Sequence, residues 1–163
     1  MKALIIGFGQ DAKVLILGLK KRNIKFKILT RTSSELDYFI PRYLKREDII
    51  FGDASDLNNL LLIFKNNNFT HVFNVAANSY VQGSYTNFDQ FLKSNTSILT
   101  NLISLNEKLY NFWLYHPISS EIYARKNNKN YIQPRNAYGL SKVCEYYISN
   151  IANKNGINLF FPI

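Results

Sequence analysis

The sequence predicts an α/β fold in which a doubly wound parallel sheet, with six strands expected, is covered by helices. Two observations carry this prediction. Short apolar runs alternate with longer amphipathic stretches along the whole chain of 163 residues, as in repeated strand–helix units. The first apolar run, residues 2–6, leads directly into a glycine turn and then into a helical pattern. We therefore interpret residues 1–163 as one domain.

The composition is that of a folded domain, and it disfavours some classes of binding partner. Hydrophobic residues make up 47% and charged residues 19% of the chain, which excludes extended disorder. The net charge of +9 is scattered and accompanies no nucleic-acid-binding motif, so a nucleic-acid-binding module is the least favoured hypothesis. The single cysteine, Cys144, allows no internal disulfide, and we expect a small buried side chain there and a reducing cytoplasm. No apolar run has the length of a membrane span or a signal peptide, so no membrane partner is expected.

The turn after the first strand has the pattern Gly-x-Gly-x-x-Ala at residues 7–12. Gly7 permits a tight turn, and Gly9 lets the backbone approach a pyrophosphate. Ala12 is small enough for a helix, apolar-periodic over residues 14–21, to pack closely on the strand. Amide groups at the start of such a helix bind phosphates. The pattern therefore predicts a dinucleotide site.

The residue after the second expected strand, 25–30, bears on which dinucleotide fits. A carboxylate near this position binds the ribose 2′-hydroxyl of NAD, whereas an arginine accommodates the 2′-phosphate of NADP. The sequence has no acid between Ile24 and Ser34, and it places Arg31 here, with Ser33 and Ser34 as further donors. NADP is thus the predicted cofactor. The alternative is an exposed loop arginine with no ligand.

The next two strands are expected at residues 49–51 and 71–77, after an irregular basic segment at 35–46. Asp53 follows the first of them and is a candidate contact for the adenine amino group. Asp53 or Ser55 could instead cap the helix expected at 56–65. The second strand ends in small residues, including Ala76, against which a cofactor can lie.

The remaining elements complete the alternation. The segment 83–108 contains a long amphipathic helix, and 112–115 is a fifth strand in which Trp113 is expected to belong to the core. A lysine- and asparagine-rich loop is expected at 125–130. A helix follows at 138–155, ended by Gly156, and then a sixth strand at 158–161 with an unprotected apolar edge. His71 and His116 each lie at a strand end without ligand-spaced partners, so no metal site is expected.

Tyr138 and Lys142 stand four residues apart at the start of the helix expected at 138–155 and therefore share one face. An ammonium held beside a phenol favours the phenolate, which makes proton transfer to a hydroxyl possible. The pair is a candidate catalytic pair, and the alternative is a solvated helix face. Glu121, two residues after Ser119 beyond the fifth strand, is either a catalytic carboxylate or an ordinary carboxylate of a helix or loop.

The chain resembles extended short-chain dehydrogenase/reductases of the NAD-dependent epimerase/dehydratase family. The features that carry the resemblance are, in order, the glycine turn, Arg31, Asp53 and the Tyr138/Lys142 pair. Further stretches are similar to the GDP-mannose 4,6-dehydratases within that family. They are Gly9-Gln10-Asp11, Arg31-Thr32-Ser33-Ser34, the stretch from Asn74 to Gln82 (Asn-Val-Ala-Ala-Asn-Ser-Tyr-Val-Gln), Ser119-Ser120-Glu121-Ile122-Tyr123 and Pro134-Arg135-Asn136-Ala137-Tyr138. The resemblance covers nearly the whole chain, but only the N-terminal half of such an enzyme.

The resemblance implies a nucleotide-sugar lyase that converts GDP-mannose to its 4-keto-6-deoxy product through an internal hydride transfer via NADP. It implies that Tyr138 takes the proton of the hexose 4-hydroxyl, with Ser119 hydrogen-bonded to that hydroxyl, and that Glu121 removes the C5 proton. Lys142 would bind the nicotinamide ribose. The implied cofactor-binding residues are Gly7, Gly9, Gln10, Asp11, Arg31, Asp53, Ala76, Tyr138 and Lys142.

Departures from the family pattern leave other hypotheses open. The glycine turn is one residue shorter than in the family and carries Ala12 in place of its last glycine. The loop between Glu121 and Tyr138 is also shorter, and the part that binds GDP and covers the sugar is expected to be missing. Without that wall we expect low turnover, and self-association or a separately encoded second half. The alternatives are a non-catalytic Rossmann remnant that at most binds a dinucleotide, or an epimerase or reductase of the same superfamily.

Overall fold

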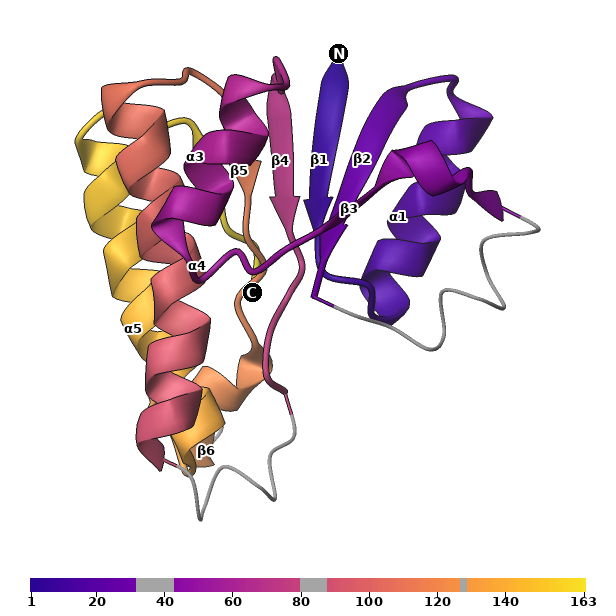
Figure 1. The fold of residues 1–163 in the computed structure, drawn as a ribbon. Coiled ribbons are helices and arrows are strands. Elements are labelled where there is room, and N and C mark those ends of the chain that lie inside the picture. The colour runs from indigo at the N-terminus through magenta and orange to yellow at the C-terminus, as the bar shows by residue number, and fades with distance from the viewer. Residues whose placement is uncertain (32–42, 80–87, 127–128) are drawn as a thin grey trace.

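The computed structural model describes residues 1–31, 43–79, 88–126 and 129–163 (Figure 1). The expected donors Ser33 and Ser34 lie outside the described residues, as do residues 35–42 of the expected irregular segment and residues 80–82 of the motif that begins at Asn74.

The predicted six-stranded parallel sheet is confirmed. Its order is β3-β2-β1-β4-β5-β8, and every neighbouring pair in it is parallel. The strands are β1 (Lys2–Ile6), β2 (Lys25–Thr30), β3 (Ile49–Phe51), β4 (His71–Asn74), β5 (Trp113–Tyr115) and β8 (Leu159–Phe160). Because the strands are parallel, their carboxyl ends meet at one edge of the sheet, where α/β folds of this kind bind ligands.

The helices lie on both faces of the sheet. α1 (Gln10–Lys21) lies on one face, while α3 (Leu57–Lys65), α4 (Phe88–Lys108) and α5 (Ala137–Lys154) lie on the other (Figure 1). The helical pattern starting at residue 14 marked the first helix too late. The helix begins at Gln10, directly after Gly9. Its start was missed because Gln10 and Asp11 are polar and exposed, and the fully buried Ala12 alone gives no apolar periodicity. Gly156, with φ of +88°, follows the end of α5 as predicted.

The core has two parts, because successive side chains of a strand point to opposite faces. On β1, Leu4 and Ile6 pack with α3 and α4, whereas Ala3 and Ile5 pack with α1. All four are at most 2% exposed. This two-sided burial explains why β1 reads as an uninterrupted apolar run.

Two shorter elements lie between β5 and α5. A 3-10 turn, η3 (Ser120–Ile122), leads into β6 (Tyr123–Lys126), which pairs antiparallel with β7 (Lys129–Ile132). The sequence predicts only a loop at 125–130. The hairpin was missed because its Lys- and Asn-rich residues carry no alternating apolar pattern. A further 3-10 turn, η1 (Arg46–Asp48), precedes β3.

The prediction that Trp113 belongs to the core is wrong, since the side chain is 59% exposed. Trp113 lies on the same sheet face as Tyr115, two residues away. By strand register, Phe73, Tyr115 and Phe160 are neighbours on that face, and their ring centroids are 5.8 Å apart at each step. Phe73 also contacts the cluster under α1, so the aromatic row continues the α1 face of the sheet. Phe160 is 63% exposed, and the described helices leave this end of the row uncovered.

Candidate functional site

A cavity of about 600 Å³ lies at the carboxyl edge of the parallel strands. Its walls come from the turn after β1, from the ends of β2, β3 and β4, and from α4 and α5. The cavity is lined by all of the residues predicted to bind the cofactor: Gly7, Gly9, Gln10, Asp11, Arg31, Asp53, Ala76, Tyr138 and Lys142. The fold therefore brings together groups that are up to 135 positions apart in the sequence, from Gly7 to Lys142.

The glycine turn combines a strained position with an open one. Gly7 has a φ of +100°, and a Cβ added to it would lie 2.9 Å from the Cα of Ala76. Only glycine fits this close approach between the turn and the end of β4. A Cβ added to Gly9 would meet no atom within 4 Å, so the backbone there faces free space. Gly9 is also the N-cap of α1 and provides no side-chain cap for the first amide groups. These features fit a phosphate group.

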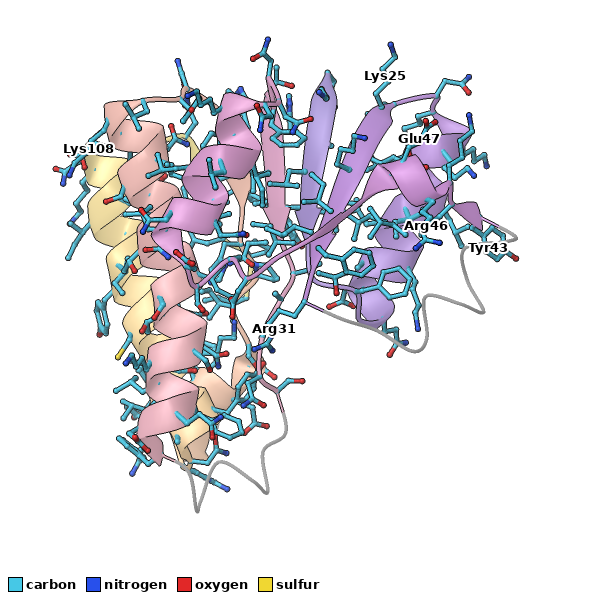
Figure 2. The ribbon with its side chains drawn as sticks, in the orientation of Figure 1. Lys25, Arg31, Tyr43, Arg46, Glu47 and Lys108 are labelled. Atoms are coloured by element: carbon cyan, nitrogen blue, oxygen red, sulfur yellow. The ribbon has the colours of Figure 1, made fainter. Side chains whose placement is uncertain are left out.

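Arg31 and Asp53 line the cavity at the ends of neighbouring strands. Arg31 directly follows β2, is exposed, and lies at the end of the sheet where the strands finish (Figure 2). Asp53 accepts hydrogen bonds from the Ser55 backbone N–H at 2.8 Å and from its Oγ at 2.7 Å. Partial burial opposes the ionised form of Asp53, but the Ser55 hydrogen bonds and the charge of Arg31 outweigh it and hold the pKa of Asp53 below its ordinary value.

The alternative role for Asp53, as a helix cap, is not observed. The N-cap of α3 is Asp56, whose Oδ1 accepts from the backbone N–H groups of Asn58 at 2.9 Å and Asn59 at 3.3 Å. Ser55 does not cap the helix either, since its hydroxyl and its amide both donate to Asp53. Asp53 is therefore left at the cavity with its carboxylate fixed by Ser55.

Tyr138 and Lys142 lie one turn apart at the start of α5, and both line the cavity. Asn136 begins this helix by accepting a hydrogen bond from the Gly139 backbone N–H at 2.7 Å. The Lys142 Nζ lies 5.9 Å from the centroid of the Tyr138 ring. The expected shared face is thus a wall of the cavity and not a solvated surface.

Ser119 and Glu121 lie close to the start of α5, but they are not among the residues that line the cavity. The Ser119 Oγ accepts a hydrogen bond from the Glu121 backbone N–H at 3.2 Å. The exposed Glu121 carboxylate accepts one from the Asn136 Nδ2 at 3.3 Å. A Cβ at Gly139 would lie 2.7 Å from the Glu121 carbonyl oxygen, so α5 packs directly on this segment.

A buried polar network surrounds the Lys142 ammonium and is not predicted from the sequence. The Lys142 Nζ donates to the Glu145 Oε2 at 2.7 Å and to the Pro117 carbonyl oxygen at 3.4 Å. The same Glu145 oxygen lies 2.8 Å from the His116 Nε2, and the His116 Nδ1 lies 2.9 Å from the Asn74 Nδ2. Asn74, His116 and Glu145 are each 1% exposed. The i, i+3 spacing of Lys142 and Glu145 was the one available signal, because His116 meets them only through the fold.

Burial alone would raise the pKa of Glu145. Its hydrogen bond to His116, together with the charges of His116 and Lys142, outweighs this effect, so the pKa of Glu145 lies below its ordinary value. Glu145 is therefore ionised at neutral pH.

A second missed network holds the segment after β4. The buried Asn95 of α4 accepts from the Asn78 backbone N–H at 2.8 Å and donates to the Asn78 carbonyl at 3.3 Å. It also donates to the Ser141 Oγ at 2.9 Å, which links α4 to α5. Asn95 was overlooked because a single asparagine inside an amphipathic helix gives no spacing signal.

Within the described ranges, no group of three or more His, Cys, Asp or Glu side chains is placed to hold a metal ion. No helix among these residues has the length and apolar character to cross a membrane.

The comparisons with known proteins agree on the fold. The structure of a UDP-glucose 4-epimerase has a TM-score of 0.85 and 17% identity, with 100% of this chain and 51% of that chain covered. The UDP-glucose 4-epimerase of Thermus thermophilus, solved with NAD, has a TM-score of 0.80 and 17% identity, with coverages of 99% and 53%. The L-threonine dehydrogenase of Clostridium difficile has a TM-score of 0.84 and 18% identity, with coverages of 98% and 51%.

The chain thus spans about half the length of these solved structures. A search of curated proteins finds no significant match. A sequence model described as the NAD dependent epimerase/dehydratase family matches residues 3–162, which is nearly the entire chain. The chain therefore belongs to the NAD dependent epimerase/dehydratase family.

Proposed function

We propose that the chain is the dinucleotide-binding part of a nucleotide-sugar 4,6-dehydratase that uses NADP and acts on GDP-mannose. The observation that carries this proposal is that Tyr138 and Lys142 line the same cavity as the glycine turn and Arg31. A proton-transfer pair and a phosphate-binding turn then serve one ligand site.

The proposed binding of NADP is supported by the hydrogen-bond donors of the cavity. The open backbone at Gly9 and the free amides at the start of α1 fit a pyrophosphate. Arg31 is an exposed guanidinium at the end of β2, where it can bind a 2′-phosphate. Ala76 offers a small surface at the end of β4, and Lys142 can donate to ribose hydroxyls. When bound, the nicotinamide supplies reversible hydride acceptance.

In the proposed reaction, side chains of this protein accept protons from the sugar. Tyr138, as phenolate, takes the proton of the sugar 4-hydroxyl, and Ser119 hydrogen-bonds that hydroxyl. Glu121 takes the C5 proton once the neighbouring carbon has become a ketone, and the C6 hydroxyl leaves with a proton as water. The hydride taken from C4 returns to C6, and a proton returned to C5 completes the 4-keto-6-deoxy sugar. Since the chain spans about half the length of its solved relatives, the wall that covers the sugar would come from protein outside these 163 residues.

Cofactor choice is tested by calorimetric titration of the wild-type chain with NADP and NAD. We expect tighter binding of NADP, and we expect Arg31→Ala to weaken NADP binding by about tenfold or more, because it removes a charge-assisted hydrogen bond, while NAD binding is unchanged. Arg46→Ala is the matched control, since Arg46 is an exposed arginine of η1 that does not line the cavity (Figure 2). Equal losses for both dinucleotides would contradict the NADP assignment.

The reaction is tested by incubating the chain at high concentration with GDP-mannose and NADP and analysing the products. A 4-keto-6-deoxy sugar supports the dehydratase, and Tyr138→Phe should lower its rate by about 100-fold or more. An epimerised sugar would indicate an epimerase of the same family. Binding without product would indicate the second candidate, a non-catalytic dinucleotide-binding domain. That candidate is favoured by the position of Ser119 and Glu121 outside the cavity wall.

A further inference from the structure

Hydrogen bonds of its side chain, in addition to the backbone of α5, fix the position of Lys142. Its side chain is 4% exposed, so its ammonium group is buried at the cavity wall. An ammonium has three donors. The carboxylate of Glu145 and the carbonyl of Pro117 each accept one hydrogen bond from it. One donor remains for a group inside the cavity.

A buried ammonium needs an anionic partner, because an unpaired charge in the interior is costly. Glu145 is that partner, with its carboxylate oxygen 2.7 Å from the Nζ. Glu145 is in turn fixed by His116, since the same oxygen lies 2.8 Å from the imidazole Nε2. His116 is oriented at its other nitrogen by Asn74, at the end of β4. The chain of contacts thus joins β4, β5 and α5 at the point where the cavity meets Tyr138.

We infer that Glu145, oriented by His116, is a positioning residue that fixes the Lys142 ammonium at the cavity wall next to Tyr138. The inference rests on the proposed function, in which Lys142 donates to the ribose hydroxyls of the dinucleotide. It assigns to His116 and Glu145 a role that neither the glycine turn nor the Tyr138/Lys142 spacing predicts. Glu145 contacts Lys142 but does not itself line the cavity.

The first test uses the wild-type chain without dinucleotide. An ammonium held in a buried ion pair exchanges its protons slowly, so a ¹⁵N–¹H spectrum of the lysine side chains should show one protected ammonium signal. Lys142→Arg, used only for assignment, should remove that signal. A wild-type spectrum without a protected Lys142 ammonium would overturn the inference.

The second test measures acetylation of Lys142 by mass spectrometry at neutral pH. Glu145→Gln keeps the shape of the side chain but removes its charge, so a buried, unpaired Lys142 should release its proton or turn outward. We expect its labelling to rise by about tenfold or more relative to Lys154, an exposed lysine of the same helix. His116→Gln, whose amide can still donate to Glu145, should keep most of the protection.

Ser149→Ala is the matched control. Ser149 is a buried residue of α5, and its hydroxyl has no hydrogen-bond partner among the described residues, so its removal should leave Lys142 protected. If Glu145→Gln also leaves Lys142 as protected as in the wild type, Glu145 is merely structural and the inference is wrong.

A binding measurement connects this arrangement to the dinucleotide. The ribose contact of Lys142 is common to NAD and NADP, so Glu145→Gln should weaken both to a similar degree, by about tenfold. Arg31→Ala, by contrast, should affect NADP alone. If the wild-type chain binds neither dinucleotide but protects Lys142 through Glu145, the proposed function fails and the positioning role stands. If both bind and Glu145→Gln changes neither the protection nor the affinities, the positioning role fails alone.

Discussion

Gly7 and Gly9 stand two residues apart in one turn but face opposite constraints. Gly7 adopts a φ of +100° against the backbone of Ala76, whereas Gly9 has a φ of −79° and free space where a side chain would point. Gly7 is therefore required by the fold, and Gly9 is required only by a ligand that approaches the backbone.

This difference gives a pair of matched variants. Gly7→Ala should lower the free energy of unfolding by about 1–3 kcal/mol, because the new Cβ is both strained and in collision with Ala76. Gly9→Ala should leave the stability nearly unchanged and weaken dinucleotide binding. Urea denaturation and calorimetric titration of both variants separate the two effects. A stable Gly7→Ala variant would contradict the turn geometry.

Glu145 should make stability depend on pH on the acid side. Its pKa in the folded chain lies below the ordinary value of 4.5, so its ionisation stabilises the folded state above that pH, and this stabilisation is lost as the pH falls through the folded pKa. At pH 7, Glu145→Gln should cost about 3 kcal/mol, because it leaves Lys142 without its partner. The difference between the two proteins should shrink below pH 4.5, as measured by urea denaturation across pH. A difference that is constant with pH would show that the carboxylate is not ionised in the fold.

At the scale of elements, the start of α5 determines where Tyr138 lies. Asn136 has two functions there, since its Oδ1 caps the helix at Gly139 and its Nδ2 donates to Glu121. The helix start, η3 and the cavity wall are thereby linked by one side chain.

Two substitutions separate these functions. Asn136→Ala should lower the free energy of unfolding by about 1 kcal/mol through loss of the cap, whereas Asn136→Asp, also a good N-cap residue, should retain most of it. Both variants lose the donor to Glu121, so a dehydratase rate that depends on this contact should fall in both. Thermal unfolding and product formation measure the two effects. Equal stability of the alanine variant and the wild type would contradict the cap.

At the scale of the whole molecule, the sheet is covered unevenly. α3, α4 and α5 pack on one face, while α1 lies on the other (Figure 1). Among the described residues this leaves the row from Phe73 through Tyr115 to Phe160 partly open, with Trp113 exposed beside it. Parallel sheets are usually buried on both faces. An open aromatic row is a surface that favours association.

We expect the 163-residue chain to bind the dye ANS and to self-associate at high concentration. Phe160→Ser should reduce both effects. Leu62→Ser is the control, because Leu62 is similarly exposed, at 61% against 63% for Phe160, but lies on α3 away from the row. Dye fluorescence and sedimentation provide the readouts, and equal effects of the two substitutions would show that the row has no special role.

Much of this architecture could be predicted from the sequence, because its signals are local. The apolar run at β1, the glycine turn and the four-residue spacing of Tyr138 and Lys142 each depend on neighbouring residues only. What was missed depends on distant contacts. His116 is 29 residues from Glu145 and 42 from Asn74, so their contacts follow only from the order of β4, β5 and α5. Trp113 was assigned to the core because an aromatic residue in a strand is usually covered, and its exposure depends on which helices lie above it.

We propose that a dinucleotide binds in the cavity between the glycine turn and the Tyr138/Lys142 pair. Mapping of backbone amide shifts by ¹⁵N–¹H spectroscopy during titration with NADP tests this binding site. We expect saturable shifts at Gly9, Arg31 and Lys142, with little change at Lys108, at the far end of α4 (Figure 2). No saturable shifts at millimolar NADP, or shifts confined to residues outside the cavity, would contradict it.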